Sequence, residues 1–265
     1  MTFQPIVPMS GYAGWAFLQR TLESQTEEFS KAPLNSRDMA YFREKIGTIV
    51  SAEELVADFR LLRSSLAAFG LQDDQNNKAF IRTVLADGTT NNDALANRLA
   101  DKRYRTFSEA FGFGEVALPK TLNSGFADTI LSRFQQQEFE RAVGEQDQDM
   151  RLALTLTREL PELIEKGYSN DTAWLSVMGN PPLRAVFETA FALPDTFGLL
   201  DLDRQLEGFK DKARQVLGTD DLSQIAEQEQ TDELLRFYLG RSQINSSFQV
   251  ASSASIALTL LQGGV

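Results

Sequence analysis

Apolar residues in this chain recur at intervals of three and four, which is the spacing of one face of an α-helix. The clearest case is a set of five residues: Leu55, Phe59, Leu62, Leu66 and Phe69. Ser51 lies three residues before Glu54, as in a capping box, and Gly70 follows as a stop signal. The spacing therefore predicts one helix that starts after Ser51, ends before Gly70 and buries these five side chains on one face.

The same periodicity predicts helices along most of the chain. Leu occurs 34 times against 20 for Ile and Val together, which favours helix because β-branched side chains lose rotamer freedom there. Strict apolar–polar alternation is missing, so the expected fold is all-α, an irregular multi-helix bundle. Pro161 should kink or divide the helix around it, and Gly240 should mark a helix end. Further helices are expected at about residues 76–86, 92–100, 102–111, 124–143, 147–165, 171–178, 182–192, 201–217, 220–229 and 231–243.

An approximate internal repeat appears at an offset of 80 residues. The matching pairs are Leu95 and Leu175, Phe107 and Phe187, Ala110 and Ala190, Phe111 and Phe191, and Phe113 and Leu193. Duplication of one helical half explains them, and so does shared packing of two helix pairs. We expect an extended arm over residues 1–10, helical halves over 11–118 and 119–245, the second packed on the first, and a low-charge tail over 246–265.

The composition excludes several classes of function. The sequence contains no Cys and no His, so thiol nucleophiles, histidine-dependent triads and zinc sites built from these ligands are excluded. Asp and Glu number 37 against 26 Lys and Arg, a net charge of −11 that argues against nucleic acid and anionic membrane surfaces as partners. The spacing Gly112, Gly114 and Ala117 follows a predicted helix instead of a strand, which indicates a helix end and turn instead of a dinucleotide loop. No catalytic residue, metal ligand or cofactor is predicted.

Two segments are candidates for binding a partner protein. Lys102, Arg103 and Arg105 form the one dense basic-aromatic patch, which could also be a solvated helix face. The tail is free of charged side chains and could be a last helix docked on its own core or an element that binds a partner. Its apolar candidates are Phe248, Val250, Ile256, Leu258 and Leu261.

The first residues and the hydropathy of the chain bear on its location. The opening MTFQPIVPMSGYAGW lacks a basic region followed by a long apolar run, so no secretory signal is visible. No stretch approaches the roughly 18 apolar residues that a membrane span needs. The expected location is the cytoplasm. The alternative is export by a route that needs no cleaved signal.

The segment from Ser51 to Gly114 resembles the bacterial domain-of-unknown-function family numbered 1217. Its most distinctive pieces are AFGL at 68–71, NKAFI at 77–81 and DKRY at 101–104. The opening FQPIVPMSGYAGWAFLQRT and the segment VFETAFALP are similar to the same family. The resemblance implies an all-helical fold, a bacterial source and a non-enzymatic role in flagellar assembly or structure, as an adaptor, chaperone or minor component that binds a flagellar partner. The alternative is an enzyme that uses Asp, Glu, Lys or Arg without zinc or a thiol.

Overall fold

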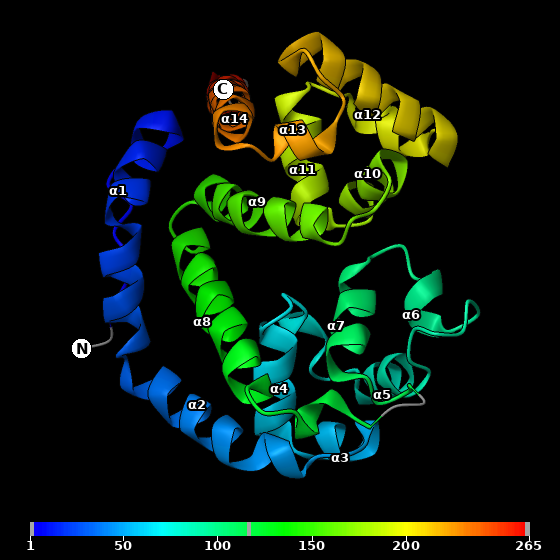
Figure 1. The fold of residues 1–265 in the computed structure, drawn as a ribbon. Helices are drawn as coiled ribbons and strands as arrows, with labels where there is room; N and C mark the ends of the chain where they lie inside the picture. Colours follow the sequence, from blue (N-terminus) through cyan, green and yellow to red (C-terminus); the bar gives the residue numbers. More distant parts are fainter. Residues whose placement is uncertain (1–2, 116–117, 263–265) are drawn as a thin grey trace. The chain divides into compact units, whose positions relative to one another are not determined.

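A computed structural model describes the backbone of residues 3–115 and 118–262, and the side chains of that range except 33–35 and 248–262. Fourteen α-helices and four short 3-10 helices make up its regular structure, and the described range holds no strand (Figure 1). This confirms the prediction of an all-α fold. Within the same range, no helix is long and apolar enough to cross a membrane.

The chain divides into two compact units, and α1 (Gly11–Ser30) contributes to both. The first unit contains Met1–Ile6 and Arg20–Gln146, and the second contains Val7–Gln19 and Asp147–Val265. The boundary after Gln146 lies later than the expected division at 118/119. The reason is that α8 (Phe126–Gly144) packs on α4 (Phe59–Ala67) and α2 (Pro33–Lys45) of the first unit, so it continues the core of that unit.

The first unit is built around a short central helix, α4, and a group of aromatic rings. Leu61, Leu62 and Leu66 of α4 are buried, and Phe107 and Phe111 pack edge to face with ring centroids 5.1 Å apart. The unit also contains α2 (Pro33–Lys45), η1 (Ile46–Thr48), α3 (Ala52–Ala57), α4 (Phe59–Ala67), η2 (Gln72–Asp74), α5 (Lys78–Ala86), α6 (Leu95–Arg98), α7 (Arg103–Phe111), η3 (Lys120–Leu122) and α8.

The helix expected between Ser51 and Gly70 is interrupted at Asp58, so that expectation was wrong in part. Ser51 caps α3 as predicted, accepting from the backbone N–H of Glu54 at 3.2 Å. Asp58 then takes an extended backbone and its carboxylate accepts from the N–H groups of Arg60 and Leu61, which starts α4 afresh. The break rotates the apolar face. Phe59 is therefore 49% exposed, although the other four residues of the predicted face are buried.

In the second unit, α11 (Pro181–Ala190) packs against α9 (Gln148–Glu165) and α14 (Gln228–Gln262) (Figure 1). Its core contains Trp174, whose ring lies 5.2 Å from that of Phe187, and Phe187 in turn packs on Phe191 at 5.6 Å. The elements are α9 (Gln148–Glu165), α10 (Asn170–Met178), α11 (Pro181–Ala190), η4 (Asp195–Leu199), α12 (Leu202–Leu217), α13 (Leu222–Ile225) and α14 (Gln228–Gln262).

Several predicted helix boundaries differ from the structure. Pro161 does not divide α9, because the buried Leu160 and Leu163 on either side anchor the helix in the core. Gly240 does not end α14, which continues to Gln262. The segments expected at 92–100 and 220–229 shorten to the four-residue helices α6 and α13. By contrast, Gly112 ends α7 with a left-handed φ of +67°, which confirms the interpretation of its glycine motif as a helix end.

Candidate functional site

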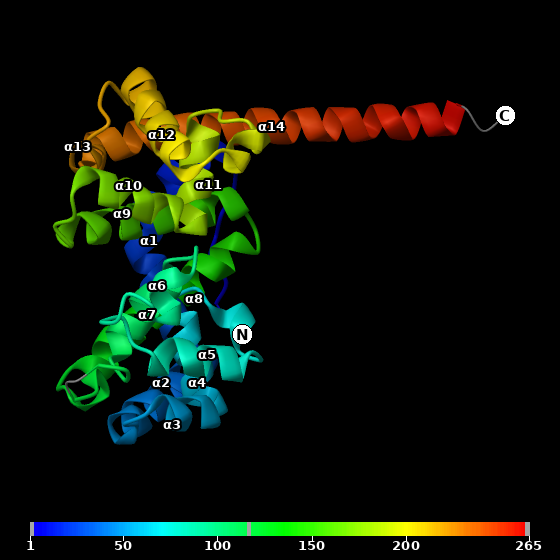
Figure 2. The same ribbon diagram turned by 90° about the vertical axis from the view of Figure 1, so that its right-hand side faces the viewer.

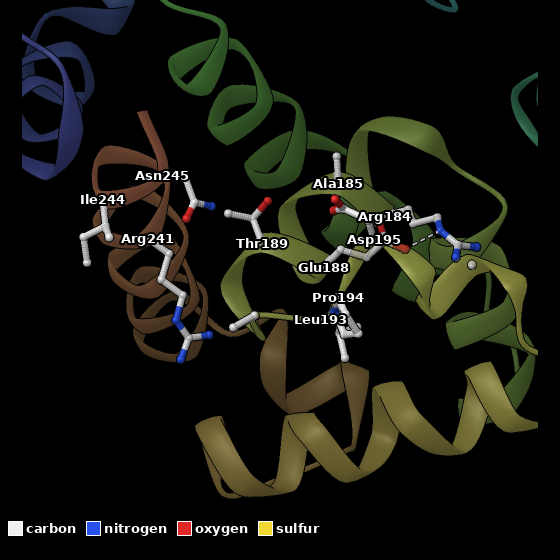
Figure 3. Close-up of a pocket in the computed structure, with 12 residues that line it drawn as sticks. Arg184, Ala185, Glu188, Thr189, Leu193, Pro194, Asp195, Arg241, Ile244 and Asn245 are labelled. Atoms are coloured by element: carbon white, nitrogen blue, oxygen red, sulfur yellow. Dashed lines mark hydrogen bonds and ion pairs between the residues drawn. The ribbon is translucent and has the colours of Figure 1, made fainter. Parts of the chain in front are cut away.

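A pocket of about 560 Å³ opens in the second unit where α11, the loop after it and α14 meet (Figure 3). Helix α11 supplies one wall, α14 supplies the facing wall, and the segment leading into η4 closes the side. The lining residues are Arg184, Ala185, Glu188, Thr189, Ala192, Leu193, Pro194, Asp195, Gly198, Arg241, Ile244 and Asn245. Two arginines and two carboxylates make the lining mixed in charge.

The pocket owes its shape to the end of α11. Ala192 takes a left-handed backbone with φ +49°, and it is the one non-glycine residue with positive φ among those described. The N–H of Leu193 then donates back to the carbonyl of Glu188 at 2.9 Å. This closure turns the chain sharply, so that Pro194 and Asp195 face the pocket from a second side.

Both arginines of the pocket are held by partners. The Arg184 guanidinium donates to the Glu188 carboxylate at 2.7 Å, the dashed contact in Figure 3, and to Gln205 Oε1 at 2.8 Å. Arg241 of α14 donates to the backbone carbonyl of Ala190, which ties α14 to the end of α11. The arginines therefore fix the walls of the pocket, and the arrangement suits polar or mixed-charge groups of a bound chain.

The pocket carries charge but no arrangement typical of a metal centre. In the described residues, no group of three or more Asp or Glu side chains lies close enough to hold a metal ion. Glu188 and Asp195 are the carboxylates on its lining, and Arg184 already neutralises Glu188. The lining offers hydrogen-bonding groups on Thr189, Asn245 and the arginines, together with apolar side chains such as Leu193.

The basic patch predicted from the sequence lies in the first unit, and each of its residues has a partner there. Lys102 Nζ donates to the carbonyls of Asn97 at 3.1 Å and Leu99 at 2.8 Å, which satisfies the end of α6. Burial and then the neighbouring charge of Arg105 lower the pKa of Lys102. Lys102 thus joins α6 to α7.

Arg103 and Arg105 also make contacts within the first unit. Arg103 donates to the carbonyl of Gly70 at 2.6 Å and pairs with Asp101 at 2.7 Å. Arg105, which is more exposed, pairs with Glu109 one turn along α7 at 2.8 Å. Their binding to a further partner stays a prediction.

The tail candidates Phe248, Val250, Ile256, Leu258 and Leu261 lie on α14, but their side chains are outside the described part of the chain. The backbone of α14 is described as far as Gln262. Figure 2 shows this helix running past the other helices of the second unit. Asn245 is the last residue of α14 that lines the pocket.

The pocket was missed by the sequence analysis. One part of the pocket could have been predicted, since Arg184 and Glu188 are spaced four apart in the sequence, as in a helical ion pair. The contact of Arg241 with the Ala190 carbonyl could not have been predicted, because nothing in a single sequence links Arg241 to a helix end fifty-one residues earlier.

Comparison with known proteins identifies a family and a bacterial relative. Residues 68–230 match the family described as "Protein of unknown function (DUF1217)". The crystal structure of protein AGR_C_984 from Agrobacterium tumefaciens superimposes with a TM-score of 0.74 at 25% sequence identity, covering 91% of this chain and 99% of that chain. No curated protein matches this chain in sequence.

Proposed function

This chain belongs to the DUF1217 family of proteins of unknown function, and we propose that it is a non-enzymatic protein that binds a partner protein through the end of α14. The observation that carries the proposal is the course of this helix. It continues to Gln262, about 25 Å beyond the pocket residue Asn245 at 1.5 Å per residue.

The sequence of that projecting part supports a protein contact. From Ser246 to Val265 it contains no Asp, Glu, Lys or Arg, whereas charged residues make up 24% of the whole chain. A segment that has no charged side chain and several apolar ones is costly to leave in water, and in this proposal another chain supplies the cover. The periodic apolar positions in the tail suit a helix that lies in the groove of a partner.

The flagellar setting of the proposal comes from the family resemblance in the sequence. On that basis the partner is a flagellar component, and the protein serves flagellar assembly or structure as an adaptor, chaperone or minor component. Its location is then the cytoplasm, or the flagellum after export without a cleaved signal. Fractionation of cells into cytoplasm and sheared filaments, followed by immunoblotting, distinguishes the two locations.

The test of the proposed function compares the full chain with a variant that lacks residues 246–265. Tagged copies of both are expressed in a motile bacterium from which the native gene has been deleted, and captured proteins are identified by mass spectrometry. A flagellar component should be enriched with the full chain and absent with the truncated one, and swimming should be restored by the full chain alone. Equal capture and equal swimming with the truncated protein would contradict the proposal.

The mixed-charge pocket is the observation that favours the alternative, an enzyme that uses Asp, Glu, Lys or Arg without zinc or a thiol. Glu188 and Asp195 would be its acid and base groups. The variant Glu188→Gln/Asp195→Asn therefore serves as the second arm of the experiment. Restored swimming with this variant supports the binding function, and lost swimming with a folded, partner-binding variant supports the enzyme.

A further inference from the structure

Three exposed leucines lie at the junction of η4 and α12 in the second unit. Leu199 is 84% exposed, Leu200 41% and Leu202 57%, although they are close neighbours in the sequence. Isolated exposed leucines are ordinary, but a contiguous group of them marks a contact surface. We call the residues Leu199, Leu200 and Leu202 the leucine turn.

The leucine turn is held rigidly from beneath by Gln205, a side chain that is itself buried. Its amide nitrogen donates to the carbonyls of Gly198 at 3.3 Å and Leu200 at 2.6 Å. Its amide oxygen accepts from Arg184 at 2.8 Å. The nitrogen of this buried amide therefore fixes the backbone that carries the leucines, and its oxygen joins the amide to Arg184.

An aromatic contact anchors the same turn to α12. The ring of Phe197, which is buried, packs edge to face on Phe209 with centroids 5.2 Å apart. Gly208 allows this close approach, since a Cβ at that position would come within 2.7 Å of the Phe197 ring. The exposed leucines are thus carried by a backbone that is already fixed before a partner binds. This preorganisation lowers the entropy cost of binding.

Exposed acidic residues lie before, within and after the leucine turn in the sequence. Asp195, Asp201, Asp203 and Glu207 are all exposed, and Arg204 is the one basic residue between positions 195 and 207. Arg204 pairs with Asp201 at 3.3 Å and both side chains are mostly exposed, so one basic side chain stands against four acidic ones in this segment. The leucine turn is therefore an exposed apolar group flanked in the sequence by exposed carboxylates, which we call its acidic edge.

We propose that the leucine turn is a docking surface for an amphipathic segment of a partner protein, with an apolar face flanked by Lys or Arg. The rigid leucines supply the apolar contact and the acidic edge selects a basic partner. A second copy of this chain, whose net charge is −11, is disfavoured by like-charge repulsion. The same edge repels anionic lipid and nucleic acid phosphates.

This inference rests on the proposed function, because both require a protein partner, but it concerns a different surface. The probe is a fluorescein-labelled 14-residue peptide of Leu and Lys in helical periodicity, titrated with the full-length chain by fluorescence anisotropy. The same peptide with Glu in place of Lys is the charge control. We expect the Leu/Lys peptide to bind, more weakly at high salt, and the Leu/Glu peptide to fail.

Variants locate the binding. Leu199→Ser/Leu202→Ser should weaken binding at least about tenfold, because these side chains form the centre of the surface. Asp201→Asn/Asp203→Asn should weaken it less and reduce the salt dependence, and Asn preserves the helix cap that Asp201 provides. The matched control is Leu118→Ser/Leu122→Ser, which removes exposed leucines of the first unit and should leave binding within about twofold.

The outcomes that overturn the inference are distinct from those that overturn the proposed function. Absence of binding, or equal weakening by the Leu118→Ser/Leu122→Ser control, removes the leucine turn as the docking surface. A dimer in light scattering that Leu199→Ser/Leu202→Ser converts to a monomer would show that the occupant is a second copy. Deleting residues 246–265 should leave peptide binding unchanged, so failure of the tail to capture a partner does not affect this result.

Discussion

Gly112 and Ala192, separated by 80 positions, occupy equivalent places in the two units, where each follows a helix with a left-handed backbone. Gly112 follows α7 with φ +67° and Ala192 follows α11 with φ +49°. Equivalent ring pairs precede the two residues, Phe107 with Phe111 in α7 and Phe187 in α11 with Phe191 just after it. The sequence offset therefore corresponds to a shared local geometry, and either duplication or convergent packing of a helix pair produces it.

The equivalence predicts opposite effects of exchanging the two residues. An L-residue in the left-handed region is strained by about 1–2 kcal/mol, part of which glycine gives back through the greater entropy of the unfolded chain. Ala192→Gly should therefore stabilise the protein by about 0.5–1 kcal/mol. Gly112→Ala should destabilise it by a similar amount or more, since its Cβ would also touch Lys120 at 3.4 Å. Urea denaturation of both variants measures the two values, and a destabilising Ala192→Gly would contradict the argument.

The interruption at Asp58 predicts very different costs for two residues of the originally predicted apolar face. Leu62→Ala should cost roughly 2–5 kcal/mol of the free energy of unfolding, because Leu62 is fully buried. Phe59→Ala should cost under about 1 kcal/mol, because half of that ring is already in water. Equal costs in urea denaturation would show that the two residues share one buried face after all.

The same region shows what sequence periodicity can and cannot decide. The intervals of three and four identified the helices and most buried residues, because burial of an apolar stripe is what stabilises a helix. They did not reveal the break at Asp58, because an Asp inside a periodic run also fits a continuous helix. Its capping role becomes visible only when its carboxylate is seen to accept from Arg60 and Leu61.

Contacts between distant segments could not be predicted from the sequence, for a different physical reason. Residues 7–19 join the second unit, where Tyr12 lies under the guanidinium of Arg236, and nothing local in either segment specifies that contact. The pocket depends on the same kind of pairing, between Arg241 and the carbonyl of Ala190. The leucine turn was missed because nothing local in the sequence shows that these leucines are exposed, and the contacts of Gln205 and Phe197 that fix the turn appear only in the structure.

The contact between Tyr238 and Asp149 predicts a loss of stability at alkaline pH. The Tyr238 hydroxyl donates to the Asp149 carboxylate at 2.9 Å, and Ser242 donates to the other oxygen. Burial, and then the Asp149 charge, raise the pKa of Tyr238 above its usual value. The folded state thus favours the neutral phenol, so its contribution is full below about pH 10 and is lost as the pH rises toward the folded pKa.

The variant Tyr238→Phe isolates this contribution. At pH 7 it should cost about 1.5–3 kcal/mol, the usual net value of a hydrogen bond to a charged group, because the Asp149 carboxylate loses a donor. Between about pH 9.5 and 11 its stability should fall less steeply than that of the parent chain, because the buried phenol is gone. Urea denaturation across this range is the measurement, and Tyr168→Phe, at a partly exposed tyrosine, is the matched control. Identical pH slopes for parent and Tyr238→Phe would refute the assignment.

The last prediction concerns the stability of the protein without its tail. Among the residues whose side chains the structure describes, the contacts that attach α14 to the second unit precede residue 246. Tyr238 and Ser242 donate hydrogen bonds to the Asp149 carboxylate, and Arg241 donates to the Ala190 carbonyl. Asn245 is the last residue of α14 that lines the pocket. Deleting residues 246–265 should therefore change the melting temperature by no more than about 3 °C, equivalent to roughly 1 kcal/mol for a chain of this size.

Ser242→Ala is the comparison for that deletion, since it removes an attachment contact while keeping the whole tail. It should lower the melting temperature more than the deletion does, because it takes a donor from a carboxylate at the start of α9. Scanning calorimetry of both proteins gives the two values. A fall of more than about 8 °C on deletion would mean that the tail is a docked part of its own unit, and the interaction role proposed for α14 would then be lost.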